Sequence, residues 1–301
     1  MTTTVATVNL NGKITGERDA VVSVFDHGFL YGEGVYEVVR TYNGRPFLLD
    51  RHLARLRQSA AMLILDVPLT GDQLAARIME TIAHAVKQMG SDPIYSGEWY
   101  IRILLTRGVG ELSYDPALCA APTVVVIVKP LAEPAAELYT KGVRVIVSSV
   151  MRNHPDSVNP MIKSNNLLNN ALAMQEGFKQ GAFEVIMRNY KGELAECAQS
   201  NFFIVKDRRA LTPPLSAGLL PGITRAFMWE VGKAAGVEVS EMTLLDEDLY
   251  NADEVFLTGT TREVMPIVEV GNRKIGDGAP GPVTRALMTE FRKMARSRDA
   301  R

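Results

Sequence analysis

The chain has 301 residues, 47% of them hydrophobic, and its 33 basic and 34 acidic residues leave a formal net charge of −1. This is the composition of a globular protein with one large domain or two of about 150 residues each, and a chain without a basic excess is not expected to bind nucleic acid. Two cysteines are too few for a disulfide framework, the N-terminus lacks signal-peptide features, and no apolar stretch is long enough to cross a bilayer, so we expect a cytoplasmic protein that does not contact the membrane.

Short strands separated by turns are predicted at the start of the chain. The turn signals Asn11-Gly12 and Asn43-Gly44 separate β-type runs at 5–10, 21–25, 35–42 and 46–49. Apolar residues then recur with helical spacing at 53–63 and 71–89, and two further strands are predicted at 99–105 and 123–128. These elements predict a small N-terminal domain at 1–128.

A proline-interrupted segment at 129–134 predicts a linker, which we extend to 129–136. The larger second domain is then expected at 137–301. Its predicted strands lie at 143–148, 184–188, 202–205 and 255–257, and its predicted helices at 165–178, 225–235 and 283–295. Because hairpins outnumber β-α-β units, we predict two α+β domains and not a doubly wound sheet.

Two segments suggest an amine and an acid acting together. Lys163 lies at the mouth of a predicted helix beside an amide-rich run, and a desolvated lysine can lose its proton and form a Schiff base. Glu196 precedes small polar residues and an aromatic strand, where a carboxylate could hold a pyridine ring protonated. Taken alone, each segment is better explained by the ordinary alternative, a solvated helix-start lysine or an exposed turn acid.

Three further segments suggest an anion site. Leu220-Pro221-Gly222-Ile223-Thr224 opens a predicted helix whose N-terminal amides could bind phosphate. The turn Thr258-Gly259-Thr260-Thr261 offers amides and hydroxyls, and Arg55 offers a guanidinium fork. Helix capping, turn chemistry and a solvated arginine are the ordinary alternatives for each. The four histidines show no metal-ligand spacing, so no metal is expected.

The ordered set of these segments resembles the class IV aminotransferases, which have fold type IV and use pyridoxal 5'-phosphate (PLP). The family signature runs from a glutamate through small residues to an asparagine and two aromatic residues, as in Glu196 to Asn201, Phe202 and Phe203. The resemblance covers nearly the whole chain. It implies a small α/β N-terminal domain, a larger pseudo-barrel PLP-binding domain, and a homodimer or higher homo-oligomer with the active site at the subunit interface.

The resemblance also implies roles by position. Lys163 would be the Schiff-base lysine and proton carrier, and Glu196 would pair with the pyridine nitrogen. The phosphate would be held by Arg55, Ile223, Thr224 and Thr260. The implied reaction is a ping-pong transfer of an amino group from an amino acid to a keto acid, with 2-oxoglutarate as acceptor.

Several segments are similar to branched-chain aminotransferases, which implies donation by L-leucine, L-isoleucine or L-valine. The implied substrate-binding residues are Tyr36, Tyr100, Arg102, Gly259, Thr261 and Arg262, of which Arg262 would bind the substrate carboxylate or point to solvent. An apolar substrate pocket would be walled by Tyr36, Tyr100, Leu168 and Met265.

Other features keep alternatives open. Leu168 stands where branched-chain enzymes usually carry a tyrosine, and Tyr36-Glu37-Val38 is similar to the D-amino-acid aminotransferases. The arginine–histidine carboxylate trap of that group is replaced by Leu112 and Tyr114. A D-amino-acid aminotransferase, with some activity on (R)-amines, is therefore the second hypothesis. An aminodeoxychorismate-type PLP lyase and a catalytically silent PLP-binding protein are the third and fourth.

Overall fold

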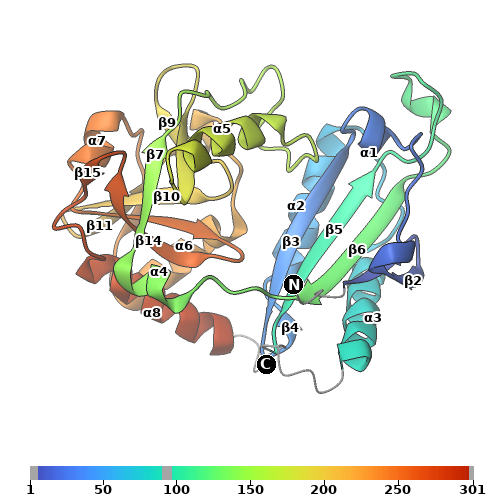
Figure 1. The fold of residues 1–301 in the computed structure, drawn as a ribbon, viewed down its shortest axis with the longest axis horizontal. Coiled ribbons are helices and arrows are strands. Elements are labelled where there is room, and N and C mark those ends of the chain that lie inside the picture. Colours follow the sequence, from blue (N-terminus) through green and yellow to red (C-terminus); the bar gives the residue numbers. More distant parts are fainter. Residues whose placement is uncertain (1–5, 90–96, 298–301) are drawn as a thin grey trace. The chain divides into compact units, whose positions relative to one another are not determined.

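The computed structural model describes residues 6–89 and 97–297. The chain forms two compact units (Figure 1): residues 1–132 with 162–166, and residues 133–161 with 167–301. The short segment Ile162–Asn166 thus belongs with the first unit, although it follows it by about thirty residues in the chain. Each unit has its own apolar core.

In its described part, the first unit is built on a six-stranded antiparallel sheet with the order β2-β1-β6-β5-β3-β4. The strands are β1 (Thr7–Leu10), β2 (Lys13–Gly16), β3 (Gly34–Tyr42), β4 (Arg45–Pro46), β5 (Trp99–Thr106) and β6 (Thr123–Pro130). The helices are α1 (His27–Leu30), α2 (Leu49–Met62) and α3 (Gly71–Met89), with 3-10 turns at Glu17–Asp19 and Pro116–Leu118.

The two faces of this sheet differ because side chains alternate along each strand. On β5, Ile101 and Ile103 are fully buried and pack with apolar residues of α2 and α3, among them Leu56 and Ile78. Tyr100 and Arg102 point to the opposite face and are partly exposed. Helices therefore cover one face of the sheet, as Figure 1 shows, and polar and aromatic side chains lie on the other.

The second unit contains a mixed sheet of nine strands that curls into a half barrel. Its order is β12-β11-β10-β13-β14-β7-β8-β9, with β15 beside β14, and β7 runs parallel to both of its neighbours. The strands are β7 (Val143–Val147), β8 (Glu184–Arg188), β9 (Leu194–Cys197), β10 (Asn201–Lys206), β11 (Arg209–Thr212), β12 (Val239–Glu241), β13 (Glu254–Gly259), β14 (Glu263–Val270) and β15 (Arg273–Lys274). The helices are α4 (Ala136–Lys141), α5 (Leu168–Lys179), α6 (Ile223–Ala235), α7 (Asp246–Tyr250) and α8 (Pro282–Ser297), with a 3-10 turn at Leu215–Ala217. The α+β class predicted from the sequence is confirmed.

Three predicted elements were wrong or misplaced. Residues 21–25 form no strand; Val21 is 73% exposed, so their β propensity is not used. The run at 46–49 is broken because Leu48 adopts a left-handed conformation with φ of 50° and α2 starts at Leu49. Helix α5 starts at Leu168 and not at residue 165, since the preceding residues pair with β3. Residue 5 of the first predicted strand lies outside the described residues.

The segment predicted as a linker contains regular structure at both ends. Strand β6 continues through Lys129 and Pro130, and α4 begins at Ala136. Pro130 lies opposite Trp99 at the end of the β5–β6 ladder, where a missing N–H costs little. Of the described helices, none is both long and apolar enough to span a membrane.

Candidate active site

Lys163 is held by its backbone against β3 and α2. Its N–H donates to the Ser59 Oγ atom over 3.1 Å, and its carbonyl accepts the Tyr36 N–H over 2.9 Å. Ser164 forms an antiparallel bridge with Val35, so residues 163–165 pair with the first part of β3. The position of the lysine backbone is thus fixed by the first unit and not by the helix that follows it in the chain.

The Tyr36 ring contacts two other predicted site residues, Lys163 and Arg102. The Lys163 Nζ atom lies 4.5 Å from the centroid of the Tyr36 ring, and the Arg102 Cζ atom lies 4.2 Å from it. Cations within about 6 Å of an aromatic face are attracted to the ring. The predicted amine and the predicted substrate arginine therefore share one tyrosine.

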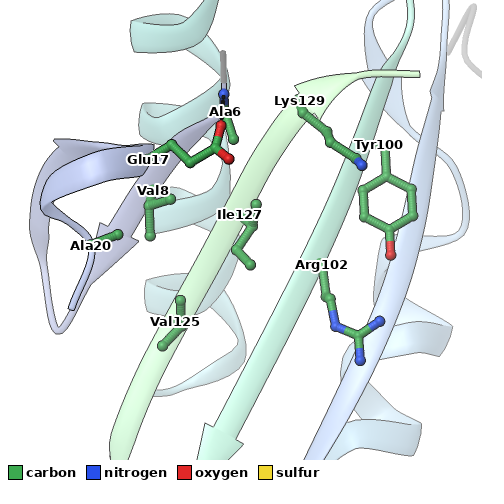
Figure 2. Close-up of a pocket in the computed structure, with 9 residues that line it drawn as sticks. All are labelled: Ala6, Val8, Glu17, Ala20, Tyr100, Arg102, Val125, Ile127 and Lys129. Atoms are coloured by element: carbon green, nitrogen blue, oxygen red, sulfur yellow. Dashed lines mark hydrogen bonds between the residues drawn. The ribbon is translucent and has the colours of Figure 1, made fainter. Parts of the chain in front are cut away.

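Tyr100 and Arg102 also line a pocket of about 620 Å³ on the face of the sheet that α2 and α3 leave uncovered. Figure 2 shows the Tyr100 side chain beside that of Lys129, whose Nζ atom lies 5.2 Å from the Tyr100 ring centroid, and Arg102 further along β5. The pocket is lined by Ala6, Val8, Glu17, Ala20, Tyr100, Arg102, Val125, Ile127 and Lys129. Its walls are mostly apolar, and Arg102, Lys129 and Glu17 add charges of both signs.

Arg55 is not a solvated surface arginine. It is 6% exposed, and its Nε and Nη2 atoms donate to the two carboxylate oxygens of Glu37 over 2.6 and 2.7 Å. The His52 Nδ1 atom lies 2.7 Å from Glu37 Oε2. Burial alone would raise the pKa of Glu37, but the Arg55 charge and the hydrogen bonds from Arg55 and His52 bring that pKa down to about 2. Burial also lowers the pKa of His52, so the ring is neutral at pH 7.

In the second unit, Glu196 lies on β9 and is 4% exposed. One of its carboxylate oxygens accepts from Arg152 Nε over 2.8 Å, and the other accepts from Asn201 Nδ2 over 3.2 Å and from the Leu220 N–H over 3.1 Å. Donors on both oxygens fix the plane of the carboxylate. A carboxylate held in this way is suited to pair with a cationic ring nitrogen.

The N-terminus of α6 lies against the same asparagine. A Cβ atom on Gly222 would overlap the Asn201 side-chain oxygen, so only glycine allows this close approach. Ile223 and Thr224 form the first turn of the 13-residue helix, and no side chain caps it. Backbone amides at such a helix start bind phosphate well.

The turn between β13 and β14 completes this region of the second unit. Asn201 on β10 pairs with Thr258 on β13, and a Cβ atom added to Gly259 would lie 3.6 Å from the Ser200 Cβ atom, which is ordinary van der Waals contact. Thr260 and Thr261 are half-buried in the turn that follows. The Thr258 hydroxyl is buried without a hydrogen-bond partner among the described residues. Turn amides, hydroxyls and the start of α6 thus lie around one end of the sheet, next to Glu196.

Arg262 follows this turn, but its side chain leads away from solvent. It donates to the fully buried carboxylate of Glu184 and, over 3.1 Å, to Gln199 Oε1. Its carbonyl accepts the Tyr139 hydroxyl over 3.2 Å. Arg262 therefore links the β13–β14 turn to β8 through Glu184 and to the β9–β10 turn through Gln199. Direct contact with a substrate stays a prediction.

Two residues predicted to wall the apolar substrate pocket differ greatly in exposure. Met265 is fully buried in the core of the second unit, whereas Leu168 at the start of α5 is 66% exposed. Burial raises the pKa of the Cys197 thiol well above its ordinary value, which makes this thiol a poor nucleophile. In the described part of the chain, no cluster of histidine, cysteine and carboxylate side chains could hold a metal ion.

The sequence predicted no role at the site for Glu37, His52, Ser59 or Arg152. Glu37 carried one usable signal, since it is an acid at an inward-facing position of a strand. His52 and Ser59 carried another, because with Arg55 they form a polar stripe at helical spacing that runs beside the apolar face of an amphipathic helix. Arg152 lies in a loop, where spacing gives no signal.

Comparison with known protein families shows which family the chain belongs to. The family described as amino-transferase class IV matches residues 34–270, which is most of the chain. This chain is a class IV aminotransferase. An inferred branched-chain-amino-acid aminotransferase of Methanocaldococcus jannaschii is 40% identical to it over 285 residues, which cover 95% of each chain. The D-alanine aminotransferase of Bacillus licheniformis is 32% identical over 294 residues, which cover 98% of this chain and 99% of that protein.

The fold of this aminotransferase is shared with solved structures. The branched-chain aminotransferase of the archaeon Thermoproteus uzoniensis, solved with norvaline, superposes with a TM-score of 0.87 at 31% identity and covers 98% of this chain and 96% of that one. A T.th. branched-chain amino acid aminotransferase, solved with pyridoxamine 5'-phosphate, superposes with a TM-score of 0.89 at 31% identity and covers 97% of this chain and 94% of that one. The predicted fold type IV architecture is thus confirmed.

Proposed function

We propose that this aminotransferase binds PLP and transfers the amino group of a branched-chain L-amino acid to 2-oxoglutarate by a ping-pong mechanism. The observation that carries the proposal is the pair of anchored groups, Lys163 against Tyr36 in one unit and the buried carboxylate of Glu196 in the other. The relative solved with pyridoxamine 5'-phosphate contains the amine form of the same cofactor.

The donor set fits PLP, which supplies an aldehyde and an electron-withdrawing ring when bound. Lys163 Nζ would form the covalent link and, once displaced by the amino donor, would move the proton from the substrate Cα. Glu196 would hold a proton on the pyridine nitrogen. The dianionic phosphate would be bound by Arg55, Ile223, Thr224 and Thr260.

The substrate would be recognised by its two ends. The Gly259 amide and the Thr261 amide and hydroxyl would bind the α-carboxylate, as groups in the turn beside Glu196. Tyr36 and Tyr100 would contact an apolar side chain, and Arg102 at the Tyr36 ring would receive the second carboxylate of the keto acid. Such a site accepts a branched-chain donor and a dicarboxylate acceptor in turn.

A D-amino-acid aminotransferase is the second candidate, favoured by Leu168 and by the similarity to the B. licheniformis enzyme. A half-reaction screen separates the two: the purified yellow enzyme is mixed with L-leucine, L-isoleucine, D-alanine, D-glutamate or (R)-1-phenylethylamine, and bleaching of the cofactor absorbance is followed. We expect L-leucine and L-isoleucine to bleach fastest. Faster bleaching by a D-amino acid contradicts the first proposal, and no bleaching by any amine indicates a lyase or a catalytically silent PLP-binding protein.

We also propose a homodimer, supported by an apolar surface on the first unit. Asp26 bridges to Val109, and the rings of Tyr31 and Tyr114 lie 4.9 Å apart, so the segments 21–31 and 109–118 are neighbours. Their exposed apolar residues are Val21, Val22, Val24, Phe25, Phe29, Val109, Leu112, Tyr114 and Leu118. A patch of this kind marks an interaction surface, and light scattering after gel filtration would test it.

Two free cysteines suit a cytoplasmic location.

A further inference from the structure

We propose that Glu37 and His52 are positioning residues that set the orientation of Arg55 for binding of the cofactor phosphate. The inference rests on the proposed function, because it presumes that Arg55 meets the phosphate of PLP. It assigns a purpose to two buried polar residues that no part of the reaction uses directly.

The contact between Glu37 and Arg55 fixes the plane of the Arg55 guanidinium group. The Nε and Nη2 atoms lie along one edge of the guanidinium group, and each donates to a different oxygen of Glu37. Two parallel hydrogen bonds remove rotation about the last bonds of the arginine side chain, which a single contact would allow. An arginine held in this way presents its remaining edge in one direction only.

His52 holds the carboxylate in turn. Its Nδ1 atom lies 2.7 Å from the Glu37 oxygen that also accepts from Arg55 Nη2. Burial lowers the pKa of His52, so the neutral ring donates from Nδ1 and adds no second positive charge. Glu37 is fully buried and His52 is 2% exposed, so solvent does not compete for these bonds.

Strand β3, which carries Glu37, and helix α2, which carries His52 and Arg55, also hold the backbone of Lys163. His52, Arg55 and Ser59 lie three and four residues apart on α2, which places them along one helix face. Ser59 accepts the Lys163 N–H, one helical turn beyond Arg55. On β3, Glu37 faces α2 while the neighbouring Tyr36 donates to the Lys163 carbonyl. Helix α2 and strand β3 thus set the distance between the phosphate arginine and the lysine that bonds the aldehyde, which are the two ends of one cofactor.

Binding of two ligands, PLP and pyridoxal, distinguishes a positioning role of Glu37 from a purely structural one. Pyridoxal has the aldehyde and the ring of PLP but lacks the phosphate. If Glu37 positions Arg55, its loss weakens binding of PLP and leaves binding of pyridoxal nearly unchanged. If Glu37 only stabilises the fold, both ligands are weakened equally. The ratio of the two dissociation constants therefore reports positioning.

The experiment compares Glu37→Gln with wild type, using apo-protein titrated with PLP or pyridoxal and followed by absorbance. A glutamine turns an N–H₂ group toward Arg55 or His52, so one of the hydrogen bonds becomes a repulsive donor–donor contact. We expect PLP affinity to fall by about tenfold or more, as for the loss of one charge-assisted hydrogen bond, while pyridoxal affinity stays within about twofold. The ³¹P shift of bound PLP should move as well. His52→Asn should change the ratio in the same direction by less.

Glu33→Gln is the matched control, since Glu33 pairs with Arg107 Nε in the same unit and has no proposed role at the cofactor. It should leave the ratio unchanged. In an Arg55→Lys background, Glu37→Gln should have no further effect on the ratio, which keeps the test valid if the single variant is less stable. If Glu37→Gln prefers PLP over pyridoxal as strongly as wild type does, or more strongly, the positioning role of Glu37 is wrong, while the proposed function still stands. Wild type that forms no adduct with either aldehyde overturns the proposed function first.

Discussion

Replacing Arg262 by methionine should destabilise the second unit, because the buried carboxylate of Glu184 would lose its cation. Glu184 has no exposed surface, and the Arg262 side chain is only 16% exposed, so water cannot replace the lost contact. Removing one partner of a buried ion pair typically costs about 3–5 kcal/mol. Two donors remain on Glu184, the Val185 N–H at 3.0 Å and the Ser200 hydroxyl at 3.3 Å.

With those donors in place, we expect Arg262→Met to lower the free energy of unfolding by about 2–3 kcal/mol. In a unit of this size, each kcal/mol lowers Tm by about 2–4 °C, so the expected loss in Tm is about 4–12 °C. The double variant Arg262→Met/Glu184→Gln should recover most of it, because no buried charge is left unpaired. Arg188→Met is the control, since its pair with Asp246 is about one-third exposed and should be worth about 1 kcal/mol or less.

Calorimetry of the four proteins, together with KM for L-leucine, tests this reasoning. A Tm for Arg262→Met within about 1 °C of wild type, or a double variant as unstable as the single one, would refute it. If Arg262 instead binds the substrate carboxylate directly, KM should rise by about tenfold or more in both variants while Tm stays unchanged.

Three further outcomes are expected. Lys163→Ala should lower the rate of amino-group transfer by about 10³-fold or more, measured by single-turnover absorbance; retained transfer contradicts the mechanism. The pKa values of His52 and Glu37 are lowered in the folded state, so the contribution of both groups to the free energy of unfolding is complete at neutral pH. The His52 contribution weakens as the pH falls below 6.5, and the Glu37 contribution is lost between pH 4.5 and about 2. Chemical denaturation should therefore show that the free energy of unfolding of Glu37→Gln falls less steeply with decreasing pH than that of wild type. Gly222→Ala should push Asn201 off Glu196 and cost about 1–3 kcal/mol, with weaker PLP binding; Gly16→Ala, in open space and at a φ of −76° that alanine adopts freely, controls for the loss of a glycine.

The sequence by itself predicted the elements whose pattern is local. The alternation in β3 and β5, the apolar periodicity of α2 and α3, and the Asn-Gly turns are properties of adjacent residues, and the structure has them at the predicted places. Resemblance added the family, which the comparisons confirm. The same local signals failed at Val21, because propensity cannot say whether a strand has a neighbour to pair with.

Only the tertiary structure showed how the polar residues are paired. Glu37 and Arg55 are 18 residues apart, Arg152 and Glu196 are 44 apart, and Glu184 and Arg262 are 78 apart, so no spacing rule connects them. The same holds for Lys163, whose backbone joins a strand that was completed more than a hundred residues earlier. A buried charge must find an opposite charge or hydrogen-bond donors within a few ångströms, and chain folding decides which distant segment supplies them.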